Sequence, residues 1–275
     1  MNAGFPPPCA ANPPPVYVAN TRVDLTCRAD VLAQLRTALG EQGALQVVHT
    51  LNPEICMNAY RNPAYLATLN KGDLNVVDGV GLQRAVQAAT SRDVDRICGS
   101  DLIYDLAELA QAAHRSLYVL GGAPDRLDKA KSALGKLYPD LKIHGFAPGF
   151  STALPLLEQD EIMTDLRKKH PGVLAVCLGA PRQEMWIAQN RALLQQCGVS
   201  IAAGLGGTVD FLSGDVRRAP KWMRKSGLEW AFRLMQNPRR LRRQISALPE
   251  FALRVRFDPN FVSLADTNAP SEGRQ

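Results

Sequence analysis

An aspartate directly after an apolar run is the ionisable residue best placed for chemistry. Asp78 follows the segment Leu74–Val77 and precedes the turn Gly79-Val80-Gly81. A carboxylate at the end of a buried strand is partly desolvated, which suits a general base that takes a proton from a substrate hydroxyl. The same position also suits an aspartate that caps the next helix. The spacing alone leaves both interpretations of Asp78 open.

Glycine-rich turns follow three other apolar runs. They contain Gly121-Gly122, Gly179, and Gly204 with Gly206-Gly207. Free amides at the start of a helix attract anions such as a diphosphate, although glycines also simply permit tight turns. None of these turns matches the GxGxxG pattern of dinucleotide-binding folds or the GxxxxGK[ST] pattern of a P-loop. The turns therefore disfavour NAD and ATP as ligands.

No metal or other cofactor is expected from the sequence. Asp93-Val94-Asp95 spells the DxD with which many nucleotide-sugar transferases hold a divalent ion, but it lies in the polar segment Ser91–Arg96 rather than after a strand. The cysteines and histidines are scattered without CxxC or HxxxH spacing. Arg96 is instead expected to help order the start of the following helix.

The positive charge of the chain is concentrated in one segment. Between Val216 and Ile245 lie ten lysines and arginines and one acidic residue, together with Trp222 and Trp230. The whole chain has a net charge of +6, so the remainder is slightly acidic. A basic, tryptophan-bearing segment on a near-neutral body indicates a partner that carries phosphate, such as a nucleotide, an anionic membrane surface or a nucleic acid.

The elements that must position these residues alternate between strand and helix. Apolar runs predict strands at Ala44–Thr50, Leu74–Val77, Leu117–Leu120, Leu141–Phe146, Val173–Leu178 and Ser200–Ala203. Helical periodicity predicts helices at Asp30–Leu39, Leu82–Ala89, Asp101–Ala113, Asp125–Leu137, Glu158–Lys169 and Gln183–Gln196. This alternation is typical of an α/β, Rossmann-like fold with a mostly parallel sheet and helices on both faces. Such folds bind ligands at the carboxyl ends of their strands, where the residues described above would lie.

We expect one catalytic domain with tails. Residues 1–15 are rich in proline and predict a disordered tail, and residues 16–214 form the α/β domain. Residues 215–257 form a basic helical appendage, with helices at Leu228–Met235 and Leu241–Leu248. Residues 258–275 are polar and predict a second disordered tail.

Several of these segments, read together, resemble the WecG/TagA/CpsF family of bacterial glycosyltransferases. The resemblance runs from about Val16 to Arg243. It is carried by Thr50-Leu51-Asn52-Pro53-Glu54, Asp78-Gly79-Val80-Gly81, Arg96 with Gly99-Ser100-Asp101, Leu178-Gly179-Ala180-Pro181-Arg182-Gln183-Glu184, Gly204 to Gly214, and Arg218-Ala219-Pro220-Lys221-Trp222.

The resemblance implies transfer of a sugar from a UDP-sugar to a polyprenyl-diphosphate-linked sugar in the assembly of a cell-surface polysaccharide. The reaction would invert the anomeric carbon, need no metal and take place at the cytoplasmic face of the plasma membrane, with the enzyme bound peripherally. N-acetylmannosamine is the favoured sugar, and glucose or N-acetylmannosaminuronic acid are alternatives. Oligomeric assembly is a further possibility that the family suggests.

The resemblance also implies roles for residues. The catalytic base of the family matches Asp78, Thr50 and Asn52 match polar positions beside it, and Gln183 matches a residue that contacts the substrate. The arginines of the family's basic appendage, which docks over the pocket and contacts the membrane, match Arg233, Arg240 and Arg243.

Together these observations predict a site without a metal. Asp78 would accept the proton of the acceptor, and backbone amides and guanidinium groups would stabilise the charge that develops on the departing UDP. The residues expected to bind substrate are Arg96, Gly121, Gly122, Arg182, Gln183, Gly206 and Gly207.

Three other classes of function compete with this interpretation. A nucleic-acid-binding protein would explain the basic segment but not the polar strand ends, and no helix-turn-helix, RRM or zinc-finger pattern accompanies the charge. We therefore expect no nucleic-acid partner. A nucleotide-dependent oxidoreductase would share the fold class but lacks its glycine fingerprint, and a non-catalytic protein could keep the same fold.

Overall fold

The chain folds around two sheets of different size. The computed structural model describes residues 13–40, 44–148, 156–216, 219–220, 223, 232 and 241–264, and only the backbone of 156–158 and 241–246. A six-stranded sheet contains β3 (Gln46–Leu51), β4 (Leu74–Val77), β5 (Leu117–Gly121), β6 (Ile143–Phe146), β7 (Val173–Cys177) and β8 (Ile201–Gly204). A three-stranded sheet contains β1 (Val16–Val18), β2 (Thr21–Val23) and β9 (Val262–Leu264).

The larger sheet is parallel throughout, in the order β4-β3-β8-β7-β5-β6. Each of the six strands predicted from the sequence is present within two residues of its expected bounds. The predicted α/β fold with a mostly parallel sheet is therefore confirmed. Because all six strands run in the same direction, their carboxyl ends share one edge of the sheet.

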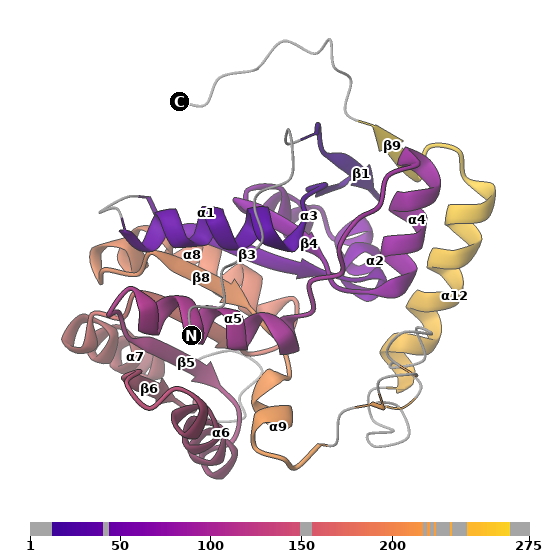
Figure 1. Cartoon of the computed structure of the whole chain (residues 1–275). Helices are drawn as coiled ribbons and strands as arrows, with labels where there is room; N and C mark the ends of the chain where they lie inside the picture. Colours follow the sequence, from indigo (N-terminus) through magenta and orange to yellow (C-terminus); the bar gives the residue numbers. More distant parts are fainter. Residues whose placement is uncertain are drawn as a thin grey trace.

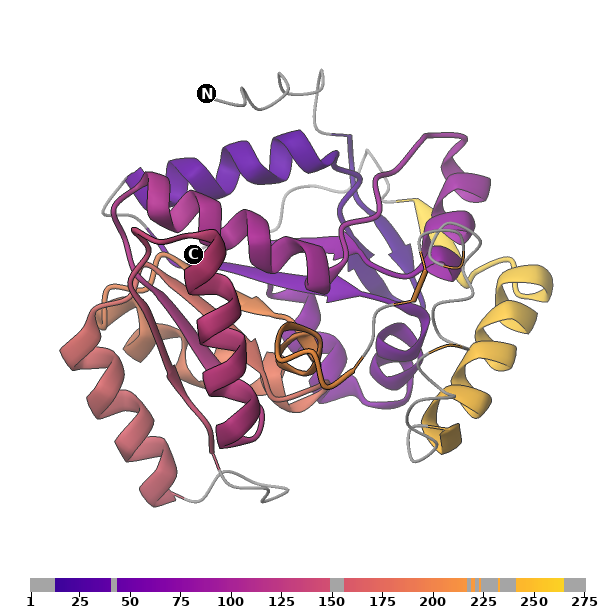
Figure 2. The same cartoon turned by 60° about the horizontal axis from the view of Figure 1, so that its bottom comes forward.

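Helices cover both faces of this sheet (Figures 1 and 2). One face packs against α1 (Arg28–Gly40), α5 (Gly99–Ala112) and α6 (Pro124–Leu137), and the other against α7 (Leu156–Lys169) and α8 (Arg182–Gln196). Strand β7 illustrates why both faces are apolar. Val173 and Ala175 join the first cluster, whereas Leu174 and Val176 join the second. Successive side chains of a strand point to opposite faces, so a central strand must be apolar at every position.

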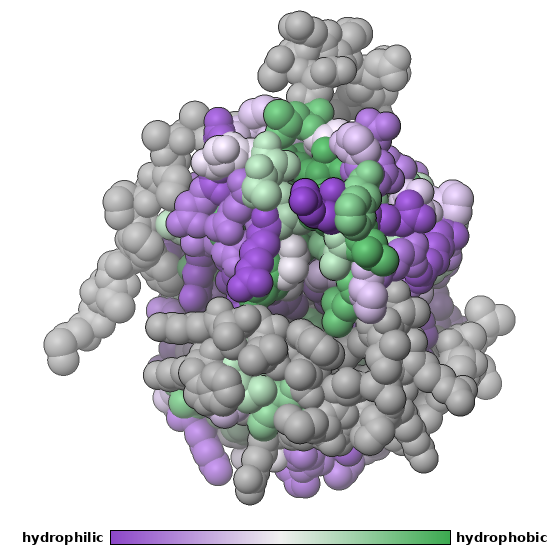
Figure 3. Space-filling view, turned by 90° about the vertical axis from the view of Figure 1, so that its right-hand side faces the viewer, coloured by the Kyte–Doolittle hydropathy of each residue, from purple (hydrophilic) through white to green (hydrophobic). Residues whose placement is uncertain are grey.

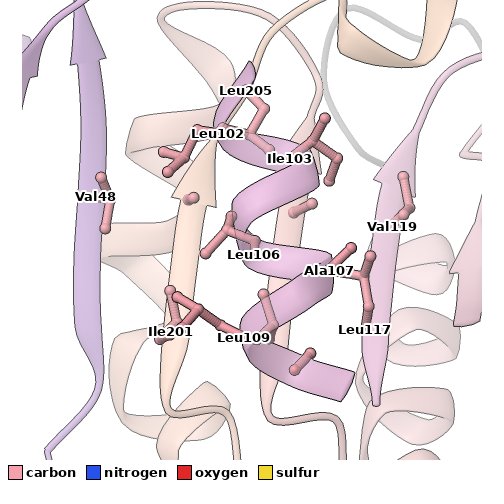
Figure 4. Packing of buried hydrophobic residues seen from close by; sticks show 14 of the residues in the cluster. Val48, Leu102, Ile103, Leu106, Ala107, Leu109, Leu117, Val119, Ile201 and Leu205 are labelled. Atoms are coloured by element: carbon pink, nitrogen blue, oxygen red, sulfur yellow. The ribbon is translucent and has the colours of Figure 1, made fainter. Parts of the chain in front are cut away.

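Helix α5 forms the centre of the first cluster. Leu102, Leu106 and Leu109 are spaced so that they lie along one side of the helix, and all three are buried. They face Val48 of β3 and Ile201 of β8 (Figure 4). Spacing of three and four residues places side chains on the same face of a helix. This packing holds the first residues of α5 at the carboxyl edge of the sheet.

A second core lies beyond β4. It is built from the small sheet and from α2 (Pro53–Arg61), α3 (Pro63–Asn70), α4 (Val80–Thr90) and α12 (Leu241–Phe257). Helices α2 and α3 were not predicted from the sequence. Each opens with Asn-Pro, in which the asparagine is the N-cap and the proline is the first helical residue. Both residue types favour these positions, so the signal was present in the sequence.

The last part of the basic appendage belongs to this packed body. Helix α12 was expected to end at Leu248, but it continues through Pro249 to Phe257 and packs against α2. Proline inside a helix removes one backbone hydrogen bond. Ala247 and Phe251 are buried in the second core on either side of Pro249. Tertiary packing of this kind outweighs a local helix-breaking residue.

The expectation of a disordered tail from residue 258 is wrong for residues up to 264. Strand β9 pairs with β1 in antiparallel register, with Val16 opposite Leu264. Phe261 is buried, and its carbonyl accepts a hydrogen bond from the amide of Ala19 at 2.8 Å. No local pattern predicts this strand, because it has only three residues and pairs with a segment at the other end of the chain.

Candidate active site

A cavity of about 170 Å³ opens at the carboxyl ends of the parallel strands. Segments that follow β3, β4, β7 and β8 form its wall, together with the first residues of α5 and with α9 (Thr208–Leu212). Its lining residues are Thr50, Asn52, Glu54, Ile55, Asp78, Gly99, Ser100, Gly179, Ala180, Gln183, Leu205, Gly206, Gly207, Thr208 and Phe211. The structure therefore brings together Thr50, Asn52, Asp78, Gln183, Gly206 and Gly207 of the predicted site.

Asp78 lies at the cavity wall, one residue after the end of β4. The N-cap of α4 is Gly79, so Asp78 precedes the capping position. The amide of Asp78 donates to the carbonyl of Leu51 at 2.7 Å, which fixes the aspartate beside the end of β3. Its side chain is partly exposed. A partly exposed carboxylate in a cavity can accept a proton from a bound hydroxyl.

Thr50 and Asn52 hold the neighbouring wall in place. The Thr50 hydroxyl donates to the carbonyl of Gly204 at 3.1 Å, which ties β3 to β8. Asn52 caps α2, because its Oδ1 accepts a hydrogen bond from the amide of Ile55 at 3.0 Å. Gly99 comes close to Thr50, and a Cβ at position 99 would lie 3.3 Å from its Oγ1. Both polar side chains therefore line the cavity and also fix its shape.

Gln183 joins two of the glycine turns. Its side-chain carbonyl accepts hydrogen bonds from the amide of Gly206 at 2.9 Å and from the amide of Gly179 at 3.2 Å. These two amides are therefore committed to a side chain. This corrects the expectation that the amide of Gly206 is free to bind an anion. At Gly179 and Gly206 the turns therefore contribute the shape of the wall rather than free amides.

A buried carboxylate lies behind Gln183. The Nε2 of Gln183 donates to Glu184 at 2.7 Å, and the hydroxyl of Tyr65 donates to the other carboxylate oxygen at 3.1 Å. Burial raises the pKa of the Glu184 carboxyl, and the hydrogen bonds from Gln183, its own amide and Tyr65 oppose that shift. Burial, together with the adjacent Glu184, also raises the pKa of the Tyr65 phenol.

A second, smaller cavity of about 110 Å³ adjoins the first. The two cavities share Gly179, Gly206 and Gly207, and the second is completed by Gly122, Cys177, Val209 and Asp210. Gly122 has a positive φ of 82°, and a Cβ there would lie 2.6 Å from a methyl group of Val209. Only glycine fits both requirements. The predicted residue Gly122 thus lines the smaller cavity. We call the two adjoining cavities together the cleft.

Three predicted residues do not line either cavity. Gly121 is the buried last residue of β5, Arg96 is partly exposed, and Arg182 is exposed with its guanidinium donating to the carbonyl of Leu178. The roles of Arg96, Gly121 and Arg182 as direct substrate ligands are not supported by this arrangement. Arg233 and Arg240 lie outside the described residues, as does the side chain of Arg243.

The DxD segment has a structural role. The carboxylate of Asp95 accepts a hydrogen bond from the amide of Arg28 at 2.8 Å, where α1 begins. Asp93 accepts one from the Gln87 side chain at 2.8 Å. Both aspartates therefore stabilise the packing of nearby elements and contribute no side chain to either cavity.

The described wall of the larger cavity is acidic. Its ionisable side chains are Glu54 and Asp78, and no lysine or arginine of the described residues lines it. Glu54, Thr208 and Phe211 also line the cavity and were not predicted as site residues. The position of Glu54 in the first turn of α2 became apparent only when the Asn52-Pro53 start of that helix was known.

Residues 16–261 match the glycosyl transferase WecG/TagA/CpsF family. An N-acetylglucosaminyldiphosphoundecaprenol N-acetyl-beta-D-mannosaminyltransferase of Bacillus subtilis is 31% identical over 209 residues, which are 76% of this chain and 78% of that protein. The protein of the same name from Bacillus spizizenii is 31% identical over 82% of this chain and 84% of its own length. That from Staphylococcus aureus strain MW2 is 25% identical over 89% and 93%, respectively.

Proposed function

Because the chain belongs to the WecG/TagA/CpsF family of glycosyl transferases, we propose that it transfers a sugar from a UDP-sugar to a polyprenyl-diphosphate-linked sugar. The names of the relatives support the acceptor, since each is a mannosaminyltransferase that acts on N-acetylglucosaminyldiphosphoundecaprenol. N-acetylmannosamine is accordingly the favoured donor sugar. UDP-glucose and UDP-N-acetylmannosaminuronate are the alternative donors.

The position of Asp78 is the observation that carries this proposal. Its carboxylate faces a cavity at the sheet edge where α/β folds bind ligands, close to the glycine turns that follow β7 and β8. In an inverting transfer, the acceptor hydroxyl oxygen bonds to the anomeric carbon as the bond from that carbon to the UDP oxygen breaks. Asp78 takes the hydroxyl proton, and UDP leaves with the bonding electrons. Thr50 and Asn52 hold the wall beside the base.

Because the described lining of the cavity is acidic, the positive charge that would bind a diphosphate there must come from another part of the chain. A diphosphate beside Glu54 and Asp78 needs cations, and no lysine or arginine among the described residues lines that cavity. The segment 216–245 is the richest source of guanidinium groups in the chain. We assign this role to Arg233, Arg240 and Arg243, because guanidinium groups bind phosphate in a bidentate manner and remain charged when partly buried. With these cations the reaction needs no metal or other cofactor.

An anionic membrane surface is the second partner we propose. Leu253 and Phe257 on α12 are 58% and 74% exposed, and Arg254 and Arg256 lie between them in the sequence. Figure 3 looks onto this side of the molecule and shows hydrophobic residues next to strongly hydrophilic ones. Apolar side chains flanked by cations bind the interface of an anionic bilayer. Within the described residues, no helix is both long and apolar enough to cross a membrane.

From the family resemblance we propose that the protein binds peripherally at the cytoplasmic face of the plasma membrane. A homo-oligomer remains part of the proposal from the family resemblance alone. Nucleic acid is not among the proposed partners, because the basic charge of the chain is accompanied by no helix-turn-helix, RRM or zinc-finger pattern in the sequence.

The experiment that tests the function is a donor panel. The protein is incubated with UDP-N-acetylmannosamine, UDP-glucose or UDP-N-acetylmannosaminuronate and a short-chain lipid-diphosphate N-acetylglucosamine, and products are identified by mass. We expect a disaccharide product with one donor, and undiminished product in the presence of a chelator. Failure of every donor would contradict the proposed reaction, and loss of product with the chelator would contradict its metal independence.

A further inference from the structure

A chain of buried hydrogen bonds runs from α3 to the floor of the cleft. Tyr65, Gln183 and Glu184 are each at most 2% exposed. The Tyr65 hydroxyl donates to one oxygen of Glu184, the other oxygen accepts from Nε2 of Gln183, and Oε1 of Gln183 accepts from the amides of Gly179 and Gly206. Two helices, α3 and α8, and two turns are thus connected through three side chains.

The start of each helix fixes one end of this chain. Asn62 caps α3 and accepts the amide of Tyr65 at 3.1 Å, so Tyr65 is held in the first turn of α3. Glu184 lies in the first turn of α8, where the helix dipole favours a negative charge. Because the Glu184 carboxylate is buried, leaving either of its oxygens without a hydrogen-bond donor would cost free energy.

The direction of the Gln183 amide decides whether the glycine turns are held. An amide side chain has one acceptor end and one donor end, and its two orientations have nearly the same shape. With its oxygen toward the turns it binds two N–H groups. If it were reversed, its NH₂ group would face those same two donors. The carboxylate of Glu184 accepts only from the NH₂ end and therefore selects the first orientation.

We propose that Glu184 and Tyr65 are positioning residues for the transfer reaction, because they orient Gln183 and through it set the separation of the turns at Gly179 and Gly206. These glycines line both cavities of the cleft, so their separation shapes the surface that receives the substrate. The expected effect of these two residues on turnover rests on the proposed function. The hydrogen-bond arrangement itself is independent of the substrate.

Gly204 packs closely against the Gln183 side chain and helps to keep its amide in place. A Cβ at position 204 would lie 2.9 Å from Nε2 of Gln183, so any larger residue would displace the amide. The carbonyl of Gly204 also accepts the hydroxyl of Thr50. Glycine at this position therefore leaves room for the Gln183 side chain and keeps the turns in register with β3.

A charge exchange between positions 183 and 184 tests the proposal. In Gln183→Glu, two carboxylates would face each other where Nε2 and Oε1 now lie 2.7 Å apart, so the connection breaks. In the double variant with Glu184→Gln, the new amide donates to the new carboxylate, which still accepts from Gly179 and Gly206. Tyr65 keeps an acceptor as well. The double variant therefore rebuilds the same connection with its donor and acceptor exchanged.

Two measurements on these variants test the proposal. Hydrogen exchange of the Gly179 and Gly206 amides reports their bonds directly, and turnover with the active donor reports the effect on the reaction. We expect Gln183→Glu and Glu184→Leu to speed exchange and to slow turnover by about tenfold or more, which is the scale for a buried group that loses its partner. We expect the double variant to recover most of both losses.

The outcomes separate the possible roles. If the Gly179 and Gly206 amides of the double variant exchange as fast as those of Gln183→Glu, the rebuilt connection does not hold the turns and the positioning role is wrong. If Glu184→Leu leaves amide exchange unchanged, the proposal is also wrong. Should the wild-type protein transfer no sugar at all, the proposed function fails, and the exchange rates alone still decide whether the hydrogen-bonded chain holds the turns.

Discussion

At the scale of single residues, the cleft combines one candidate base with side chains that hold its walls. Asp78 faces the cavity, and Thr50, Asn52 and Gln183 line it while making hydrogen bonds within the protein. Substitution of these three residues would therefore change both the shape of the site and any contact with substrate. Asp78 is the residue whose substitution tests the proposed proton transfer directly.

Replacement of Asp78 by asparagine should slow turnover by about 10²–10⁴-fold, the usual contribution of a general base. The amide keeps the size of the side chain but cannot take the proton. Steady-state turnover and binding of UDP would be measured together, and we expect UDP binding to persist. Asp93→Asn is the matched control, because Asp93 is exposed and bonds to Gln87 away from the cavity. Equal activity of Asp78→Asn and the wild type would exclude Asp78 as the base.

The buried His49 should make the free energy of unfolding depend on pH. Burial lowers its pKa to about 3, with a further contribution from the charges of Arg22 and Arg191. Below pH 6.5 the unfolded chain takes up a proton at His49 that the folded protein does not, so acidification favours unfolding. This residue should lower the free energy of unfolding by about 2 kcal/mol between pH 7 and pH 5.

Urea unfolding at the two pH values, compared with His49→Gln, measures this effect. The variant cannot take up the proton, so its loss of stability over the same interval should be smaller by that amount. The same pH dependence in both proteins would show that His49 titrates normally.

At the scale of elements, α12 and β9 fasten the C-terminal part of the chain to the second core. Arg61 and Glu250 form an ion pair between α2 and α12, and Arg254 lies 4.7 Å above the ring of Tyr60. Phe261 contacts both Tyr60 and Phe251 edge to face. The N-cap of α2, Asn52, and Glu54 in its first turn both line the cavity, so these contacts connect the C-terminal helix to an element of the cavity wall.

Phe261→Ala should lower the free energy of unfolding by about 3–5 kcal/mol, as for other buried phenylalanines. The change leaves a cavity between β9, α2 and α12, and we expect faster proteolysis within α12. Leu264→Ala, three residues further along at the end of β9, is the matched control, because Leu264 is 61% exposed. Denaturant unfolding and limited proteolysis of both variants would be compared. Similar stability of the two would show that β9 does not hold α12.

At the scale of the whole molecule, the basic segment is tethered at both ends beside the cleft. Before it, α9 contributes Thr208 and Phe211 to the cavity, and after it, α12 packs on α2. A truncation near Gly214 would therefore also remove Ala247, Phe251 and Phe261 from the second core. Point substitutions test the segment without this loss of packing.

Changing Arg233, Arg240 or Arg243 to alanine should each reduce turnover by about a hundredfold, the scale for removing a group that stabilises the developing charge. Arg239→Ala and Arg242→Ala are controls from the same segment, and we expect them to retain turnover with a water-soluble acceptor. Circular dichroism would verify that every variant is folded. Nearly normal turnover in all three of the first variants would refute the assignment.

Flotation with vesicles tests the membrane surface. The protein should float with vesicles that contain anionic lipid at low salt, and high salt should weaken binding because it screens the charges. The double variant Leu253→Ser and Phe257→Ser should bind less. Leu137→Ser is the matched control, because Leu137 is 60% exposed on α6, far from α12 in Figure 1. Equal flotation of the double variant and the control would place the contact elsewhere.

The sequence by itself determined the parallel sheet, the alternation of strands and helices, and the candidate base. Apolar runs such as Leu74–Val77 and Val173–Cys177 are local signals, because a strand buried on both faces must be apolar throughout. The rule that ligands bind at strand carboxyl ends then brought Asp78, Thr50 and Gln183 to one site before their positions were known.

Only the tertiary structure decided which polar groups are engaged and which face the cleft. Tyr65 and Glu184 are 119 positions apart, and Val16 and Leu264 lie at opposite ends of the chain, yet each pair is in contact. No local pattern encodes such pairs, since they depend on how the helices pack. The glycine turns show the same limit. Their composition predicted free amides, whereas the side chain of Gln183 takes up two of them.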